Sequence, residues 1–422
     1  MAGPAARLDL RAGWRKVTRV NRPDDGRKLR VLFLNSCVSG GGAGRSLTAY
    51  LEHEASSIEA HVVMPKPGVI AERLSSLATL HMMPEFVERI QRSPYRFAAL
   101  PVPGLDIAGG VTALAVSAAK LKKLVERIEP DVIHCNHMLA KPVGVGVGAA
   151  TRTPVVLHVR NIHAHGIERA FFQALGRARS VRKILCNSRA SAEPFQAVVP
   201  DKVAVAYNFV DLGKFERARV EPKLRAEFGL PPNAIVIGYL GRIIEWKGID
   251  VLIRAFARVH RECPEAWLVI VGDNDGLLKR DRKAEYEALA RELGVSDRTR
   301  FTGFKDDVRP YVVDFDILAL PSRKPEPFGR VLIEAMALGV PAVATAHGGA
   351  VEVVRDGQNG LWVKPDDADD LGEKLIALCR DRDRRMVLGS QSAMDVRSQF
   401  DGATLARQVT RLLREAAAGS AT

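Results

Sequence analysis

The stretch that decides the fold runs from residue 321 to residue 349 and reads Pro-Ser-Arg-Lys-Pro-Glu-Pro-Phe-Gly-Arg-Val-Leu-Ile-Glu-Ala-Met-Ala-Leu-Gly-Val-Pro-Ala-Val-Ala-Thr-Ala-His-Gly-Gly. The apolar run at 315–320 predicts a buried strand before it, and the run at 340–345 predicts a second strand. Between them a helix is predicted to start near residue 328 or 329 and to stop at Gly339. The polar loop therefore follows the carboxyl end of a strand, where open α/β sheets bind ligands.

Two carboxylates bracket this loop and the start of the helix. Glu326 lies in the loop and Glu334 lies in the helix, eight positions further on. Backbone N–H groups around Gly329 and Arg330, at the helix start, suit a phosphate, and carboxylates accept hydrogen bonds from sugar hydroxyls. The spacing alone favours two solvated glutamates. Within the whole string we prefer a site for a ligand that joins a sugar, phosphates and a ribose.

The length and the net charge of the chain limit the number of domains and the kinds of partner that can be expected. A chain of 422 residues is too long for one ordinary core, so two domains are expected. Its net charge of +13 predicts an anionic partner, which could be nucleic acid, acidic lipid or a phosphorylated substrate, or simply a basic surface. The 47% apolar and 26% charged residues are typical of a globular protein.

Cysteine usage and hydropathy predict the compartment. The five cysteines are scattered singly, without a C-x-x-C pair, which indicates reduced thiols in a cytosolic protein. No apolar run reaches the roughly 18–20 residues of a membrane span, and the first thirty residues lack a hydrophobic signal core. We therefore expect a cytoplasmic protein. The basic residues 1–28 predict either a disordered tail or an amphipathic helix on anionic lipid at the inner face of the membrane.

A glycine-rich segment follows the first predicted strand, at 30–35. Residues 39–46 read Ser-Gly-Gly-Gly-Ala-Gly-Arg-Ser, and a helix is predicted from about Ser46. Glycine lets the backbone approach ligand oxygens closely, so the segment predicts an anion cradle. It nearly spells the P-loop of NTPases, but Ser39 stands where that motif needs Gly and Arg45 where it needs Lys.

Strand-like and helical segments alternate through both halves of the chain. In the first half strand-like runs occur at 61–64, 132–135, 155–159, 183–186 and 203–206. After a Pro- and Gly-containing stretch at 211–233 the alternation restarts with the run at 234–240, and an amphipathic helix is predicted at 402–417. This alternation predicts parallel, doubly wound sheets.

Two cations follow the strand predicted at 234–240. Arg242 and Lys247 lie between Gly241 and Gly248. An arginine can bind two phosphate oxygens at once, and a lysine acts as a mobile point charge, so the pair predicts a diphosphate site.

No metal site is predicted. His163 and His165 have no local carboxylate or cysteine partner. Two Asp-x-Asp strings also occur, at 273–275 and 314–316, and for Asp314 and Asp316 we prefer a capping role at a strand start.

These motifs together resemble the retaining GT-B glycosyltransferases of family 4 (group 1). The resemblance rests on the E-x7-E string ending at Glu334, on the Gly-Arg-to-Lys-Gly string 241–248, on the Gly41-Gly42 pair and on the turn at 208–211. It implies an α/β, GT-B fold in which two Rossmann-like, doubly wound domains face each other across a cleft. The implied organisation is a basic tail (1–28), an N-terminal acceptor-side domain (29–212), a linker (213–233), a C-terminal nucleotide-sugar-binding domain (234–400) and a helix that packs back on the first domain (401–422).

The resemblance also implies roles for individual residues. Glu326 would contact the donor sugar, Glu334 the ribose, and both Arg242 and Lys247 the diphosphate. Family members usually place a histidine at the end of the strand at 155–159; here Arg160 stands there, and Arg160 or a neighbouring histidine would take over the contact, although His158 could equally be a buried strand residue. The remaining implied donor contacts are Gly41, Gly42, Gly303, Phe304, Phe328, Gly329, Arg330 and Val331.

The implied activity is transfer of a sugar from a UDP- or GDP-linked donor with retention of anomeric configuration and without a metal or another cofactor. Expected partners are that donor, a glycan, lipid-linked or small-molecule acceptor, and an anionic membrane surface, but no nucleic acid. A P-loop-like NTPase and a basic polyanion-binding protein are the alternatives.

Overall fold

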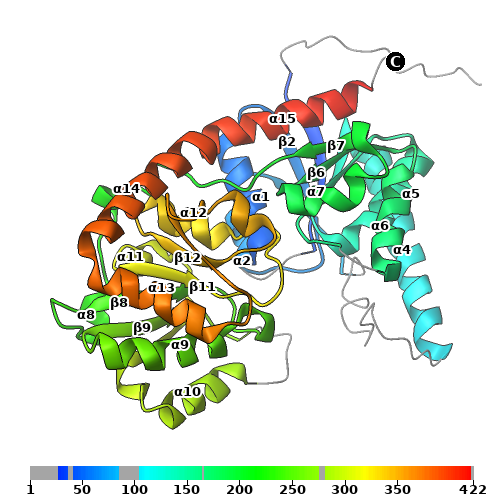
Figure 1. Ribbon diagram of the computed structural model, residues 1–422. Helices are drawn as coiled ribbons and strands as arrows, with labels where there is room; N and C mark the ends of the chain where they lie inside the picture. The colour runs from blue at the N-terminus through cyan, green and yellow to red at the C-terminus, as the bar shows by residue number, and fades with distance from the viewer. Residues whose placement is uncertain (1–26, 37–40, 85–103, 164–165, 275–280, 420–422) are drawn as a thin grey trace, which may run out of the picture.

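The computed structural model describes residues 27–36, 41–84, 104–163, 166–274 and 281–419. Two parallel sheets, one of seven strands and one of six, lie beside each other with helices on both faces (Figure 1). We call the seven-stranded sheet with its helices the first lobe and the six-stranded sheet with its helices the second lobe. The predicted fold class, α/β with two Rossmann-like sheets, is confirmed.

The first lobe has the strand order β3-β2-β1-β4-β5-β6-β7. Its five central strands are largely buried because helices cover both faces of the sheet, whereas its two edge strands are partly exposed. The strands are β1 (Leu29–Leu34), β2 (Ile58–Met64), β3 (Thr79–Met82), β4 (Val132–Cys135), β5 (Val155–Val159), β6 (Val181–Cys186) and β7 (Val203–Val205). The helices are α1 (Gly42–Glu54), α2 (Val69–Leu74), α4 (Gly104–Ile128), α5 (Lys141–Thr151), α6 (Gly166–Arg177) and α7 (Arg189–Gln196).

The second lobe repeats this pattern with the order β10-β9-β8-β11-β12-β13. Its strands are β8 (Ile235–Leu240), β9 (Ala266–Val271), β10 (Thr299–Gly303), β11 (Ile317–Leu320), β12 (Ala342–Thr345) and β13 (Gly360–Val363). Its helices are α9 (Ile249–Glu262), α10 (Arg282–Glu292), α11 (Arg309–Val312), α12 (Arg330–Ala337), α13 (Ala368–Arg380) and α14 (Arg382–Gln399). The order reverses between β8 and β11, and ligands of such sheets bind beyond the carboxyl ends of strands at this point.

Short 3₁₀ helices join several of these elements. They are η1 (Met138–Ala140), η2 (Pro200–Lys202), η3 (Arg217–Arg219), η4 (Glu245–Lys247), η5 (Ser296–Arg298) and η6 (Gly349–Glu352).

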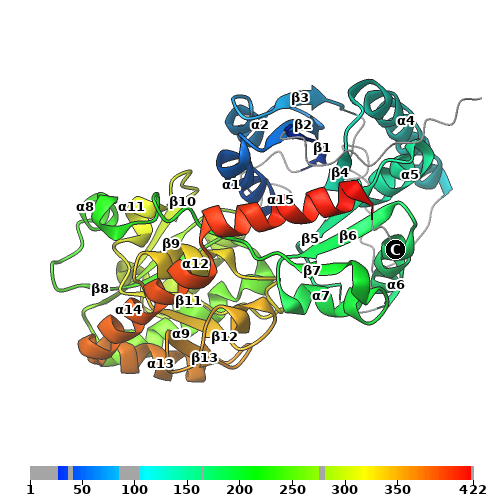
Figure 2. The ribbon, with the colours of Figure 1, turned by 90° about the horizontal axis from the view of Figure 1, so that it is seen from above.

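The last helix, α15 (Gly402–Ala418), returns from the second lobe to the first (Figures 1 and 2). It packs on α1, where the Thr410 hydroxyl lies 2.7 Å from the Tyr50 hydroxyl and donates to the Glu54 carboxylate at 2.8 Å. Helix α15 therefore packs against the first lobe although it follows the second lobe in the chain.

The stretch predicted as a linker carries helix α8 (Leu224–Phe228). Leu224 is fully buried in the second lobe. The N–H of Arg225 donates to Asp314 and the N–H of Val236 donates to Asp316, at 3.1 and 2.8 Å. These two carboxylates therefore satisfy backbone groups at the starts of a helix and a strand.

In the described ranges no group of three or more His, Cys, Asp or Glu side chains could hold a metal ion. Asp275 and His165 lie outside those ranges.

Helix α1 starts earlier than predicted. Its first residue is Gly42 rather than Ser46, because the N–H of Arg45 already donates to the carbonyl of Gly41 at 3.1 Å. Arg45 therefore belongs to the first turn of a helix. Ser39 and Gly40 lie outside the described residues.

Cys135, Cys186, Cys263 and Cys379 are buried free thiols, and Cys37 lies outside the described residues. Among the helices in the described part of the chain, none combines the length and the apolar character needed to cross a membrane.

Candidate active site

Glu326 lies in the loop after β11, and its carboxylate is held from two sides. One carboxylate oxygen, Oε1, accepts hydrogen bonds from Lys247 Nζ and from Ser322 Oγ, each at 2.5 Å. Only 4% of Glu326 is exposed. A buried carboxylate with a cation and a hydroxyl at one oxygen keeps a fixed orientation, so its other oxygen has a defined position for a ligand.

The backbone of Glu326 is fixed as firmly as its side chain. Its carbonyl accepts the N–H of Gly349 at 2.6 Å. Gly348 has φ = +66°, and a Cβ at this position would lie 2.4 Å from the same carbonyl oxygen. Only glycine allows this close approach. The ring of His347 lies against the same loop, with Nε2 2.8 Å from the carbonyl of Ser322.

Lys247 and Arg242 come from the loop after β8. The two loops pack tightly because Gly248, at φ = +68°, comes so near Pro321 that a Cβ would lie 2.0 Å from its carbonyl oxygen. This packing brings the Lys247 ammonium to Glu326. Arg242 is exposed, and its carbonyl accepts the hydroxyl of Tyr239 at 2.9 Å. Burial and then the Glu326 charge raise the pKa of Tyr239 well above its usual value, so Tyr239 stays a donor.

The start of α12 presents backbone N–H groups beside Glu334. Gly329 has φ = +83° and no side chain caps the helix. Arg330 Nε lies 2.8 Å from Glu334 Oε1, although the N–H is not aimed well enough for a hydrogen bond. Phe328 is 1% exposed and packs on Tyr207, so only its backbone remains for a ligand. Val331 also packs against the core of the second lobe.

Arg45 of the first lobe reaches this end of the second lobe. Its guanidinium lies 5.8 Å from the centre of the Phe304 ring, and its Nη2 donates to the carbonyl of Asp306 at 3.2 Å. Burial lowers the pKa of Arg45, while the Glu334 charge opposes this shift. Phe304 follows Gly303 and is 54% exposed. The first turn of α1, with Gly41 and Gly42 at its start, therefore stands opposite the residues predicted to contact the nucleobase.

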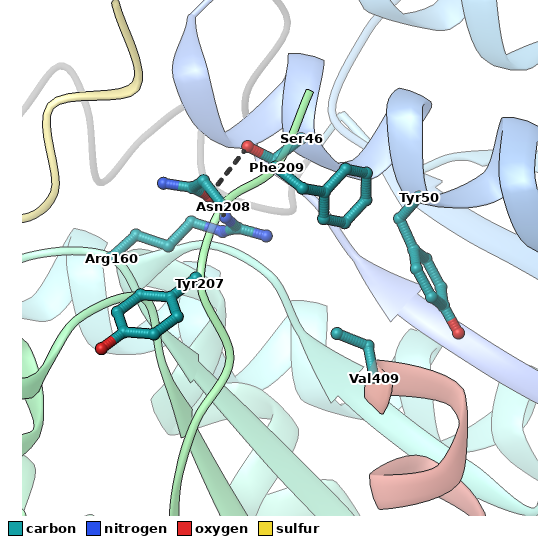
Figure 3. Close-up of a pocket in the computed structure, with 7 residues that line it drawn as sticks. All are labelled: Ser46, Tyr50, Arg160, Tyr207, Asn208, Phe209 and Val409. Carbon is teal, nitrogen blue, oxygen red and sulfur yellow. Dashed lines mark hydrogen bonds between the residues drawn. The ribbon is translucent and has the colours of Figure 1, made fainter. Parts of the chain in front are cut away.

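Arg160 lies apart from that group, directly after β5 in the first lobe. Its terminal nitrogens donate to Asn208 Oδ1 at 2.7 Å and Asn136 Oδ1 at 3.2 Å. Figure 3 shows Arg160 in a pocket between α1, the turn at Asn208 and α15, where Ser46 also donates to Asn208. These two hydrogen bonds join Arg160 to the first lobe and to the turn between the lobes.

His158 is a buried strand residue behind Arg160. It is 5% exposed, and its Nδ1 lies 3.3 Å from Arg160 Nη2 and 3.1 Å from His134 Nε2. Burial and then the Arg160 charge push the pKa of His158 well below its usual value. His158 therefore stays neutral and positions Arg160, whereas Arg160 is the group nearer to the pocket.

The structure brings Lys247, Glu326, Gly329, Arg330 and Glu334 to one edge of the second sheet. Sequence reasoning missed Ser322 and the reach of Arg45 across the lobes. Ser322 lies four residues before Glu326, and this spacing is its only signal in the sequence. In the sequence Arg45 stands out only as a departure from the P-loop motif.

Two Rossmann-like sheets that lie beside each other form the GT-B fold. The sequence matches the profile "Glycosyltransferase Family 4" over residues 40–214 and "Glycosyl transferases group 1" over residues 220–394. The chain belongs to this family, the group 1 (family 4) glycosyltransferases.

Curated relatives agree with this assignment. The D-inositol 3-phosphate glycosyltransferase of Kribbella flavida is 31% identical over 76% of this chain and 80% of its own length. That of Corynebacterium kroppenstedtii is 34% identical over 51% of this chain, but the match spans only 49% of that relative. The N-acetyl-alpha-D-glucosaminyl L-malate synthase of Bacillus anthracis is 26% identical over 67% of this chain and 74% of its length.

Among solved structures, HepE of Anabaena in complex with UDP and glucose superposes with a TM-score of 0.75 and 26% identity. The match covers 92% of this chain and 99% of HepE.

Proposed function

We propose that this enzyme transfers a hexosyl group from a UDP- or GDP-linked sugar to a hydroxyl group of its acceptor, with retention of anomeric configuration and without a metal ion. The observation that carries the proposal is the contact between Lys247 and Glu326, 2.5 Å apart at the edge of the second sheet. In the proposed site Lys247 binds a phosphate and Glu326 binds sugar hydroxyls, so their contact supports a donor in which a sugar is joined to a phosphate.

The donor would lie along this edge in one direction. Its sugar hydroxyls bind Glu326, and its pyrophosphate lies between Lys247, Arg242 and the N–H groups at the start of α12. Its ribose binds Glu334, and its base lies near Phe304. Lys247 has three donors, so it can keep its contact with Glu326 and still donate to a phosphate oxygen.

The chemistry needs charge stabilisation at two places. When the anomeric C–O bond breaks, positive charge develops on the sugar ring and negative charge on the leaving diphosphate. Lys247, Arg242 and the α12 N–H groups face the developing negative charge. We propose that the acceptor attacks from the same face, and that the leaving phosphate takes the proton of the acceptor hydroxyl.

Retention and metal independence can be tested on the product. We expect an α-linked donor to give an α-linked product, and full activity in EDTA. The one-bond or vicinal coupling of the anomeric proton, measured by NMR, reports the configuration. A β-linked product, or activity that returns only on adding Mg²⁺ or Mn²⁺, would contradict these two parts of the proposal.

A donor screen tests the function as a whole. A ligand that binds the native state raises its thermal stability. We expect a UDP- or GDP-sugar to raise the unfolding temperature, and UDP-glucose is the first candidate because HepE was solved with UDP and glucose. The control is the Lys247→Met variant, in which the shift should shrink. No shift and no turnover with any UDP-, GDP- or ADP-sugar would overturn the proposal.

The identity of the acceptor is also a proposal. Glycans, lipid-linked sugars and small hydroxyl compounds are candidates, and the relatives' names make D-inositol 3-phosphate and L-malate the first ones to try.

We also propose peripheral attachment of the basic residues 1–28 to anionic membranes on the cytoplasmic side. Sedimentation with vesicles of phosphatidylserine and phosphatidylcholine, with and without residues 1–28, tests this; equal sedimentation of both proteins would reject it.

A further inference from the structure

Helix α14 packs one face on the second lobe and leaves the other in solvent. Its buried face carries Leu388, Ser392 and Val396. The Ser392 hydroxyl lies 3.4 Å from the carbonyl oxygen of Met336, which belongs to α12. In both ribbon views α14 lies at the margin of the second lobe, on the side away from helices α4, α5 and α6 (Figures 1 and 2). The outer face of α14 is therefore accessible to another molecule.

This outer face is apolar, although the solvent side of a surface helix is usually polar. Met386, Val387 and Met394 are 59%, 67% and 55% exposed. A single exposed apolar side chain is normal on a protein surface, but several on one helix face form a patch, and a patch rimmed by polar residues marks an interaction site. Arg382 and Arg384, both exposed, lie at one end of this patch. The face is therefore suited to contact another surface.

The outer face also has a regular sequence pattern. Five exposed residues follow one another at intervals of four, three, four and three positions: Asp383, Val387, Ser390, Met394 and Arg397. Because an α-helix has 3.6 residues per turn, this spacing puts all five on one stripe along the helix, as in the seam of a coiled coil. We call these five residues the α14 stripe. It has the spacing that a second helix requires for packing along it.

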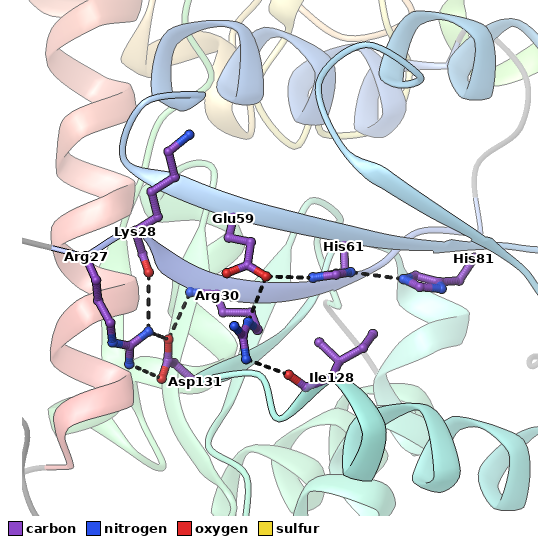
Figure 4. Close-up of polar contacts among 8 residues, drawn as sticks. All are labelled: Arg27, Lys28, Arg30, Glu59, His61, His81, Ile128 and Asp131. Atoms are coloured by element: carbon purple, nitrogen blue, oxygen red, sulfur yellow. Dashed lines mark hydrogen bonds and ion pairs between the residues drawn. The ribbon is translucent and has the colours of Figure 1, made fainter.

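The two ends of the α14 stripe carry opposite charges. Within the described part of the chain, neither Asp383 nor Arg397 forms an ion pair or a side-chain hydrogen bond. Their signs suit the two ends of the helix dipole, but that effect does not require them to lie on the apolar stripe. Elsewhere on the surface such residues pair within the chain, as Arg30 does with Glu59 at 2.8 Å (Figure 4). The α14 stripe instead suits a partner with the opposite order of charges.

The α14 stripe is complementary to itself. Asp383 lies seven positions before Ser390 and Arg397 lies seven positions after it; Met386 and Met394 lie four positions before and after it. When two copies of the helix pack antiparallel about Ser390, each Asp383 faces Arg397 of the second copy. In a parallel pair, like charges would face each other and repel. A two-fold axis through Ser390 therefore brings unlike charges together twice.

We infer that α14 is the contact surface of a symmetric homodimer, in which the stripes of two copies pack antiparallel about Ser390. In this dimer Met386 faces Met394 of the second copy, and both leave water. An anionic lipid surface attracts a face whose charges are all cationic, whereas Asp383 lies within this stripe. One pair of 18-residue helices buries less than a standard interface of about 1,600 Å². We therefore expect a dissociation constant of roughly 1–100 µM.

Sedimentation velocity of the full chain, over roughly 1–300 µM, tests the inference. We expect the wild type to show a monomer–dimer equilibrium. Met394→Ser should weaken the dimer roughly tenfold or more, because an apolar side chain is lost from the interface on both copies. Met82→Ser is the control, because Met82 is 42% exposed but lies in the first lobe, and it should dimerise like the wild type. A wild type that stays monomeric, or equal weakening by the two substitutions, would overturn the inference.

Exchanging the two charges tests the antiparallel arrangement. Asp383→Arg and Arg397→Asp each put like charges opposite each other at two symmetric places, and each should weaken the dimer roughly tenfold. The double variant restores unlike pairing, so its dissociation constant should return to within about threefold of the wild type. Urea unfolding establishes that the variants are equally stable, as expected for exposed positions. Additive weakening in the double variant would contradict the antiparallel pairing and with it the inference.

A cysteine at the centre of the stripe locates the two-fold axis. In Ser390→Cys two thiols, one from each copy, lie opposite each other. Oxidised glutathione converts them into one disulfide and is itself reduced to two molecules of glutathione. We expect a covalent dimer that a reducing agent separates, and none in the wild type or in Ser76→Cys, which changes an exposed serine of the first lobe. Equal amounts of covalent dimer in all three proteins would overturn the inference.

A vesicle experiment separates the dimer from a lipid contact. The wild type and Met394→Ser are sedimented with vesicles of phosphatidylserine and phosphatidylcholine. We expect equal sedimentation of the two proteins, because the stripe contacts a second copy of the chain. Sedimentation that Met394→Ser abolishes, in a wild type that stays monomeric, would overturn the homodimer and assign this face to lipid. The inference is independent of the donor site, so neither result changes the proposed function.

Discussion

The ammonium of Lys247 lies 2.5 Å from the carboxylate of Glu326, so the loop after β8 and the loop after β11 meet at one ion pair. The two side chains are 13% and 6% exposed. At such burial an ion pair is sensitive to loss of either member, because the remaining charge is left without its partner.

Replacing Glu326 by Gln should abolish most sugar transfer. Gln keeps the shape of the side chain but removes the charge that holds Lys247 and that, in the proposed site, binds donor hydroxyls. We expect kcat/KM to fall by about 10²- to 10³-fold and stability to fall by about 2 kcal/mol. The exposed Glu373→Gln on α13 is the control. Transfer rates are measured well below the unfolding temperature, and near-normal turnover would remove Glu326 from the active site.

Replacing Gly348 by Ala should damage both stability and transfer. The new Cβ would lie 2.4 Å from the Glu326 carbonyl oxygen at φ = +66°. We expect a loss of about 3 kcal/mol from strain and crowding together. Gly357→Ala is a matched control, because its φ is +70° but its Cβ would meet open space; it should cost only about 1 kcal/mol. If urea unfolding showed the same loss of unfolding free energy in Gly348→Ala and Gly357→Ala, crowding against Glu326 would contribute nothing to stability.

Asp306 links the lobes near Phe304, where Arg73 of α2 forms an ion pair with it and Arg45 donates to its carbonyl. This carboxylate is 60% exposed, so Asp306→Ala should change stability by less than about 1 kcal/mol. We expect the donor KM to rise roughly fivefold, because the lobes close less often. Glu193→Ala removes an exposed ion pair within the first lobe and is the control. A donor KM that is unchanged at low salt would refute this role.

Glu352 also joins the two lobes. Its carboxylate accepts the N–H groups of Arg189 and Ala190, at 2.9 and 3.0 Å, and so caps helix α7 of the first lobe from the second. Glu352→Ala should cost about 1 kcal/mol, as for a lost cap. Hydrogen exchange should show faster exchange of the Arg189 and Ala190 amides; unchanged exchange would mean that the cap does not persist in solution.

The buried histidines predict the pH dependence of folding. The pKa of His134 is about 3 in the folded chain, against 6.5 for an exposed histidine. Between these values the unfolded chain takes up a proton that the folded chain does not. Stability should therefore fall as pH drops from 6.5 towards 3, by about 1.4 kcal/mol per pH unit for this group. Urea unfolding of the wild type and of His134→Gln measures the slope, and an identical slope would contradict the assignment.

Much of the second lobe could be predicted from sequence because its signals are local. The apolar run at 315–320, the helix start at Gly329 and the run at 340–345 correspond to β11, α12 and β12, with ends shifted by one or two residues. The start of α1 was wrong by four residues, since glycines at 42 and 44 read as a loop although they are compatible with a first helical turn.

Sequence by itself determined the alternation of strands and helices, the family, and the identity of Glu326, Glu334, Arg242 and Lys247 as candidates, because each of these depends on neighbours within about one turn or loop. Only the tertiary structure decided that Lys247 pairs with Glu326, that Arg45 lies against Phe304, and that Arg160 rather than His158 lines a pocket. Those contacts join residues far apart in the chain, and the order of strands in two sheets, not local preference, brings them together.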